Sequence, residues 1–118
     1  MELYKEFSFE AAHFLPKVAD DHKCKKMHGH SYKVIVYING PIDLLTGWVM
    51  DFADLNRAFQ PILSQIDHTV LNNVEGLENP TVECLTVWIW ERLFPSLPLL
   101  SKIVIQETST SGCIYEGK

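Results

Sequence analysis

The histidine pair in the segment His28-Gly29-His30 is the strongest chemical signal in the sequence. On an extended backbone, residues two apart point to the same side, so both imidazoles can reach one metal ion at about 2 Å. His13 is the best candidate for a third ligand, since it ends an alternating segment that can pair with the strand carrying the other two. Three neutral histidines with an open fourth position are typical of a catalytic zinc site. The alternative is a hydrogen-bonded core histidine at position 13 and a chance pair at 28 and 30.

Cys24 lies four residues before His28 and allows two functional interpretations. It can be a fourth ligand that closes a structural metal site. It can instead be a reactive thiolate beside an open metal site, favoured by the charge of the metal and of the neighbouring lysines at positions 23, 25 and 26. An ordinary loop cysteine is the third possibility.

Two further groups could act on a substrate. Asp67 and His68 follow a predicted helix, either as an exposed pair at its end or as a carboxylate that orients an imidazole for proton transfer. Glu107 follows Ile103 and Ile105 at a spacing of two residues, so its side chain points toward the apolar side of a predicted strand. A carboxylate on that side needs a charged or hydrogen-bonding partner. That partner can be a Lys or Arg, or a ligand with two adjacent N–H donors that a carboxylate accepts in a fork.

Alternating and helical patterns indicate the elements that must position these groups. Strands are predicted over 2–13, 30–39, 101–108 and 113–115. One helix is predicted after the cap residue Asp51, with a kink or local break at Pro61, and another is predicted to start near Asn79-Pro80-Thr81. The order is strand, strand, helix, helix, strand, strand. We therefore predict an α+β fold in which an antiparallel sheet carries two helices on one face.

Length and composition limit the remaining possibilities. A chain of 118 residues corresponds to one domain, which we assign to 1–118. A net charge of −5 argues against a nucleic-acid-binding protein. No apolar run is long enough to span a membrane, and the first residues do not resemble a signal peptide. Three cysteines without a C-x-x-C pair fit a reducing compartment, so we expect a cytoplasmic protein.

Six segments of the sequence form a combination that is more specific than any one motif. In order, they are F-S-F-E-A-A-H from Phe7, C-K-K-M-H-G-H from Cys24, G-W-V-M-D-F from Gly47, L-S-Q-I-D-H from Leu63, L-E-N-P-T-V-E from Leu77 and E-T-S-T-S-G-C from Glu107. Through these segments the sequence resembles the 6-pyruvoyltetrahydropterin synthase family over nearly its whole length. Within that family it is most similar to the bacterial 6-carboxytetrahydropterin synthases of queuosine biosynthesis.

This resemblance implies a zinc-dependent lyase that converts 7,8-dihydroneopterin triphosphate to 6-carboxytetrahydropterin, acetaldehyde and triphosphate. A pyruvoyltetrahydropterin synthase, which keeps the three-carbon side chain, and a non-catalytic zinc- or pterin-binding module are the alternatives. The implied fold is a four-stranded antiparallel sheet with two helices on one face, of the tunnelling-fold type. Its subunits form trimers or hexamers with active sites at subunit interfaces.

The resemblance also implies roles for individual residues. Zinc would be bound by His13, His28 and His30, and Cys24 would abstract a proton rather than bind the metal. Asp67 and His68 would relay protons. Glu107 would anchor the pterin and take part in the relay.

Overall fold

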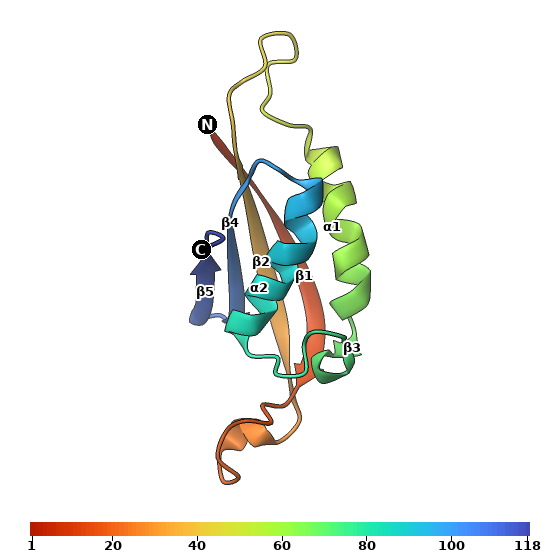
Figure 1. Ribbon diagram of the computed structural model, residues 1–118, viewed down its shortest axis with the longest axis vertical. Coiled ribbons are helices and arrows are strands. Elements are labelled where there is room, and N and C mark those ends of the chain that lie inside the picture. The colour runs from red at the N-terminus through yellow and green to blue at the C-terminus, as the bar shows by residue number, and fades with distance from the viewer.

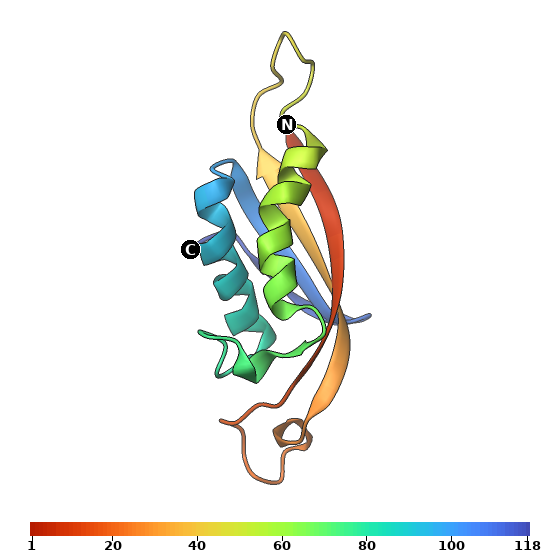
Figure 2. The same cartoon turned by 90° about the vertical axis from the view of Figure 1, so that its right-hand side faces the viewer.

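The computed structural model describes residues 1–118 as a five-stranded sheet covered on one face by two helices (Figure 1 and Figure 2). The strands occur in the sheet in the order β3-β1-β2-β4-β5. Their bounds are β1 (Glu2–His13), β2 (His28–Asn39), β3 (Thr69–Val70), β4 (Leu100–Thr108) and β5 (Ser111–Tyr115), and the helices are α1 (Phe52–Ile66) and α2 (Val82–Leu93).

Strands β1 and β2 form the long antiparallel pair that the alternation predicts. Their register runs from Glu2 opposite Asn39 to His13 opposite His28. One side chain in two is buried against the helices, and these residues join β4 and the two helices in a single core. The rings of Phe9 and Tyr32 stack across the two strands with centroids 4.7 Å apart. In both strands, the side chains that point toward the helices therefore alternate along the chain as far as the histidines at the end of the pair.

Helix α1 begins at the predicted cap residue Asp51, and α2 begins after Thr81, within the start predicted near 79–81. The Asp51 carboxylate accepts a hydrogen bond from the Ala53 N–H, and the Thr81 hydroxyl accepts one from the Cys84 N–H. Helix α1 is continuous through Pro61, so the local break allowed by the sequence does not occur. Figure 2 shows the two helices side by side over the sheet, which leaves the other face of the sheet uncovered.

The prediction of a four-stranded, fully antiparallel sheet was wrong. Between the helices, Thr69 and Val70 form the fifth strand, β3, which pairs in parallel with Ala11 and Ala12 of β1. The order along the chain is therefore ββαβαββ. Two residues are too few for an alternating pattern to be recognised, because the strand is defined by its pairing with β1 rather than by its own sequence.

Two loops extend from opposite ends of the sheet and give the chain its elongated shape of 58 × 23 × 23 Å. Residues 14–27, which include Cys24, form the lower loop of Figure 1, and residues 40–51 form the upper one. The lower loop contains a short 3₁₀ turn, η1 (Lys23–Lys25). None of the helices has the length and apolar character needed to cross a membrane.

Candidate metal centre and active site

Three histidines and one carboxylate converge at the lower end of the β1–β2 pair. His13 and His28 are directly opposite each other in the register, and His30 lies two residues further along the same face of β2. The centroids of the three rings are 4.6 to 5.0 Å apart. One donor atom from each histidine and one from Glu107 all lie within 4.8 Å of one another. Such a group of donor atoms could hold one metal ion.

Backbone carbonyls orient two of the imidazoles. His13 Nδ1 lies 2.8 Å from the Pro80 carbonyl oxygen, and His28 Nδ1 lies 2.8 Å from that of Lys26. A carbonyl oxygen only accepts hydrogen bonds, so in each ring Nδ1 carries the proton and the lone pair of the neutral imidazole is on Nε2. Such a hydrogen bond to the second ring nitrogen is the usual support of a metal-binding histidine.

The free nitrogens of the cluster have no hydrogen-bond partner in the chain. Nε2 of His13 and Nε2 of His30 are buried and make no hydrogen bond. Oε1 of Glu107 lies 3.3 Å from the first and 3.0 Å from the second. A buried lone pair that faces a carboxylate, as the Nε2 lone pair of His13 does, is unfavourable unless a cation lies between the two groups. The residues therefore fit a bound metal ion, and neutral nitrogen donors with one carboxylate are a set that zinc accepts.

Electrostatics keep these groups in their metal-binding forms. Burial lowers the pKa of the His30 imidazole, although the Glu107 carboxylate opposes this effect. Contact with the His13 imidazole holds the pKa of Glu107 below its usual range in spite of partial burial. Burial raises the pKa of the neighbouring Tyr32, so its phenol remains neutral. An ionised carboxylate and a neutral imidazole are the forms that bind a metal.

Glu107 reaches the cluster because the β4–β5 hairpin is irregular at that point. The register shifts between Gln106 and Thr108, so Glu107 lies in a β-bulge at the end of β4. Gly112 on β5 makes the close approach possible, because a Cβ atom there would lie 2.1 Å from the Ile105 carbonyl oxygen. Within the chain, the partners of Glu107 are thus two histidines rather than the Lys or Arg that the sequence allowed.

Cys24 lies beside the metal cluster but outside its compact donor set. It is half-buried in the turn η1, and it lines a cavity of about 460 Å³ together with Lys23, His28, His30, Glu107 and Thr108. Its carbonyl oxygen accepts a hydrogen bond of 2.8 Å from the Leu15 N–H, which ties the turn to the end of β1. A molecule in this cavity would lie within reach of both the thiol and the histidine cluster.

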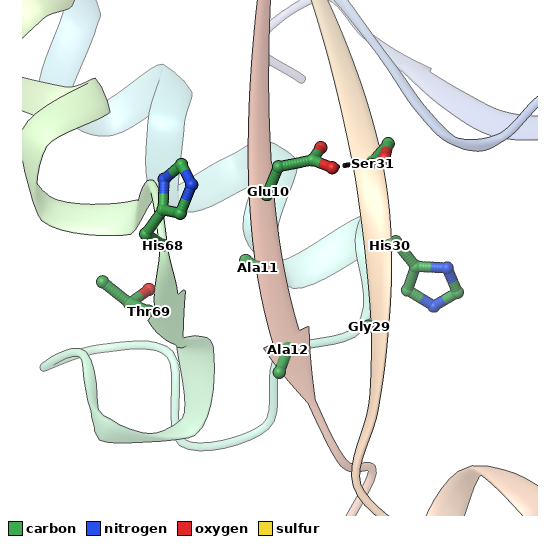
Figure 3. A pocket seen from close by; sticks show the side chains of 8 residues that line it. All are labelled: Glu10, Ala11, Ala12, Gly29, His30, Ser31, His68 and Thr69. Atoms are coloured by element: carbon green, nitrogen blue, oxygen red, sulfur yellow. Dashed lines mark hydrogen bonds between the residues drawn. The ribbon is translucent and has the colours of Figure 1, made fainter.

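Asp67 and His68 lie at a different place. The Asp67 carboxylate lies 2.9 Å from His68 Nδ1 and accepts a hydrogen bond of 3.0 Å from the Glu10 N–H. His68 has a φ of +59°, and its side chain is 78% exposed. It lines a second cavity, of about 530 Å³, shared with Glu10, Ala11, Ala12, Gly29, His30, Ser31 and Thr69. Figure 3 shows the His30 ring projecting from β2 on the side away from His68. One chain therefore does not place His68 and Cys24 in the same cavity.

Comparison with known proteins assigns a family to this arrangement. The family model described as 6-pyruvoyl tetrahydropterin synthase matches residues 2–118. The chain belongs to this family. Its relatives include a protein of Synechocystis sp. named 6-carboxy-5,6,7,8-tetrahydropterin synthase, which is 41% identical over 96% of this chain and 91% of that protein. The human 6-pyruvoyl tetrahydrobiopterin synthase is 33% identical over 99% of this chain and 92% of its own.

The fold agrees with a solved structure from the same family. The 6-pyruvoyl tetrahydropterin synthase of Caenorhabditis elegans superimposes with a TM-score of 0.93 at 29% sequence identity, over 100% of this chain and 96% of that one. The resemblance seen in the sequence is thereby confirmed, as is the expectation that the chain is an enzyme of the pterin synthase class.

Sequence reasoning did not identify the groups that orient the metal ligands. The carbonyls of Lys26 and Pro80 and the side chain of Asn72, which hydrogen-bonds the backbone of Phe14, are all close to the cluster. Backbone carbonyls have no sequence signature, because every residue carries one. Asn72 stands only four residues after His68, but no pattern singles it out from Asn73 beside it.

Proposed function

We propose that this protein is a zinc-dependent 6-carboxytetrahydropterin synthase of queuosine (7-deazaguanine) biosynthesis. It would convert 7,8-dihydroneopterin triphosphate and water to 6-carboxy-5,6,7,8-tetrahydropterin, acetaldehyde and triphosphate. The observation that carries the proposal is the cavity in which a thiol, two of the clustered histidines and a carboxylate meet, in a chain 41% identical to a protein named for this activity. Its volume of about 460 Å³ is in the range of small-molecule sites.

Each side chain of the site has a role that its position supports. Zinc held by His13, His28 and His30 would supply a positive charge that acidifies substrate hydroxyls and stabilises developing oxyanions. In the same cavity, Cys24 would take a proton from a substrate carbon. The imidazole of His68, oriented by the Asp67 carboxylate, would give or accept the second proton.

Glu107 would recognise the pterin ring. Adjacent N–H donors of a pterin match the two oxygens of an ionised carboxylate, and charge-assisted bonds of this kind are stronger than neutral ones. The lowered pKa of Glu107, caused first by the His13 imidazole, keeps that carboxylate ionised. Its side chain is 23% exposed, so a molecule in the cavity can reach it.

Replacing Glu107 by Gln is expected to lower kcat/KM by about 10- to 100-fold, the usual cost of losing one charged hydrogen-bonding partner. Zinc affinity should change little, since three histidines remain. Steady-state kinetics and zinc competition with a chromogenic chelator measure the two effects. Glu116→Gln, at an exposed position near the C-terminus, is the matched control. A large loss of zinc affinity with Glu107→Gln would instead make Glu107 a metal ligand.

Cations beside the cavity are candidates to receive the triphosphate. Lys23 lines the cavity with Cys24. In contrast, the Lys25 ammonium donates hydrogen bonds to the carbonyls of Pro16 and Val18, which stabilises the loop. We therefore assign triphosphate binding to Lys23 in preference to Lys25.

A complete active site would be built from two copies of the chain, in a homo-oligomer such as a trimer or hexamer. Within one chain, Cys24 and His68 line different cavities. The sheet also has edges that another copy can pair with, because β1 before Glu10 has no neighbour on its outer side and β5 has none beyond it. Pairing of these edges between copies would remove the exposed backbone groups and bring the two halves of the site together.

The experiment that tests the function is incubation of zinc-loaded protein with 7,8-dihydroneopterin triphosphate. Acetaldehyde and a 6-carboxy pterin are the expected products, identified by an aldehyde assay and by mass. The human relative, 33% identical and named a pyruvoyl synthase, makes a pyruvoyl pterin without acetaldehyde the second candidate outcome. A folded, zinc-bound sample with no turnover would point to a non-catalytic zinc- or pterin-binding module.

The three unpaired cysteines, including the thiol this reaction needs, suit the reducing cytoplasm.

A further inference from the structure

The side chain of Asn72 makes two hydrogen bonds to the backbone of a single residue, Phe14. The Asn72 Nδ2 group donates to the Phe14 carbonyl oxygen at 2.9 Å, and the Phe14 N–H donates to Asn72 Oδ1 at 3.0 Å. Phe14 immediately follows His13, a candidate metal ligand. The amide is half-buried, so both bonds are partly shielded from water.

These two bonds extend the short parallel ladder between β1 and β3, which lies beside the end of β1 in Figure 3. Ala12 is opposite Val70 in that ladder, and two residues further along each chain are Phe14 and Asn72. At Leu71 the backbone turns into a 3₁₀ helix, η2 (Leu71–Asn73), and leaves the sheet. The amide of Asn72 offers the same donor and acceptor as a peptide group, so it takes the place of the departed backbone.

The residues that follow Phe14 connect this contact to the rest of the site. The Leu15 N–H donates to the Cys24 carbonyl oxygen at 2.8 Å. On the other side of Phe14, the His13 ring is bound to the Pro80 carbonyl, which belongs to the same segment between the helices as Asn72. Residues 13–15 are thus held between the helix connection and the Cys24 turn.

We infer that Asn72 is a positioning residue, which fixes the end of β1 so that the metal ligand His13 and the Cys24 turn keep their relative places. This inference rests on the proposed function in one respect, namely that the histidine cluster binds zinc. Asn72 belongs neither to the group of clustered donor residues nor to the lining of the Cys24 cavity, so it acts through its hydrogen bonds to the backbone of Phe14.

The test is the zinc affinity of Asn72→Ala, measured by competition with a chromogenic chelator. Loss of supporting hydrogen bonds around metal ligands usually costs 10- to 100-fold in affinity, and we expect about 10-fold here. Hydrogen exchange at the Leu15 amide should become faster, because its bond to Cys24 is no longer held in place. Asn73→Ala changes the exposed neighbour, for which the structure shows no side-chain hydrogen bond, and should match the wild type in both measurements.

Two further variants separate positioning from general stability. Ile38→Val removes one methyl group from the core at the opposite end of β2, and should lower the unfolding temperature without changing zinc affinity. Asn72→Asp keeps the shape of the side chain but places a carboxylate oxygen against the Phe14 carbonyl oxygen. It should therefore lose zinc affinity as Asn72→Ala does. If Asn72→Ala does not fold, Asn72→Asp provides the test.

Wild-type zinc affinity in a folded Asn72 variant would overturn the inference, as would an equal loss of affinity in Ile38→Val. A wild-type protein that binds no zinc would overturn both this inference and the proposed function, whereas zinc binding without turnover would contradict the proposed reaction alone.

Discussion

Replacement of Cys24 by Ala is expected to abolish turnover and leave zinc bound, whereas replacement of His28 by Ala removes both. The thiol lines the cavity but lies outside the compact donor set, so its loss removes a proton acceptor and no ligand. Removal of a general base lowers the rate by about 10²- to 10⁴-fold. Removal of His28 takes away one of three neutral nitrogen donors that a catalytic zinc site needs. Metal content after dialysis, together with turnover rate, distinguishes the two variants.

Cys84→Ala is the matched control for this pair. Cys84 lies exposed on α2 and is not among the residues that line the Cys24 cavity, so its replacement should leave both zinc content and turnover unchanged. Alkylation of the zinc-bound wild type should modify Cys24 and stop turnover with the metal retained. Release of zinc from Cys24→Ala would make the thiol a ligand, and the site would then be a closed structural one.

Much of the metal cluster could be predicted from the sequence because it lies on regular strands. The alternation of Phe7, Phe9 and Ala11 fixes the parity of β1, and the same parity brings His13 to the buried face. The H-G-H segment continues the alternation of β2. Antiparallel pairing then leaves little freedom in where the three rings meet. Helix starts were predictable for a similar reason, since a capping side chain acts on the next few residues only.

Features that depend on contacts between distant segments could not be predicted in this way. The strand β3 exists because Thr69 and Val70 meet β1, and two residues carry no period of their own. The position of Glu107 depends on a bulge whose geometry is set by Gly112 on the neighbouring strand. Sequence parity placed Glu107 on the correct face, but its histidine partners come from strands far away in the chain.

The Asp67–His68 pair is a third case. That these two residues are adjacent in the sequence does not indicate on which side of the sheet strands their side chains lie. Helix α1 ends at Ile66, and the positive φ of His68 turns its ring outward, next to Glu10 on β1. The His30 ring of the histidine cluster projects from β2 on the side away from His68 (Figure 3). Neither periodicity nor spacing indicates this separation, because it follows from where the short strand β3 joins the sheet.

Mixing two inactive variants is therefore expected to restore activity. Cys24→Ala and His68→Ala each lack one group, and neither should turn over substrate alone. In an assembly whose sites take the thiol from one copy and the imidazole from another, random mixing gives about a quarter of the sites both groups. The two variants are unfolded together and refolded, or co-expressed, and the recovered rate is compared with that of the wild type. Light scattering confirms that the mixed protein is an oligomer.

The decisive control is a mixture of Cys24→Ala with the double variant that lacks both groups. No site in that mixture contains an intact thiol, so a rate above background there would come from contamination rather than from shared sites. A mixture of the two single variants that stays inactive, although light scattering shows one mixed assembly, would mean that each chain uses its own His68. The His68 ring would then have to cross from its exposed position beside β1 to the cavity on the other side of β2, a movement that the parallel pairing of β3 with β1 opposes. Shared sites require no such movement, and the restored rate is the result that this arrangement of the two cavities predicts.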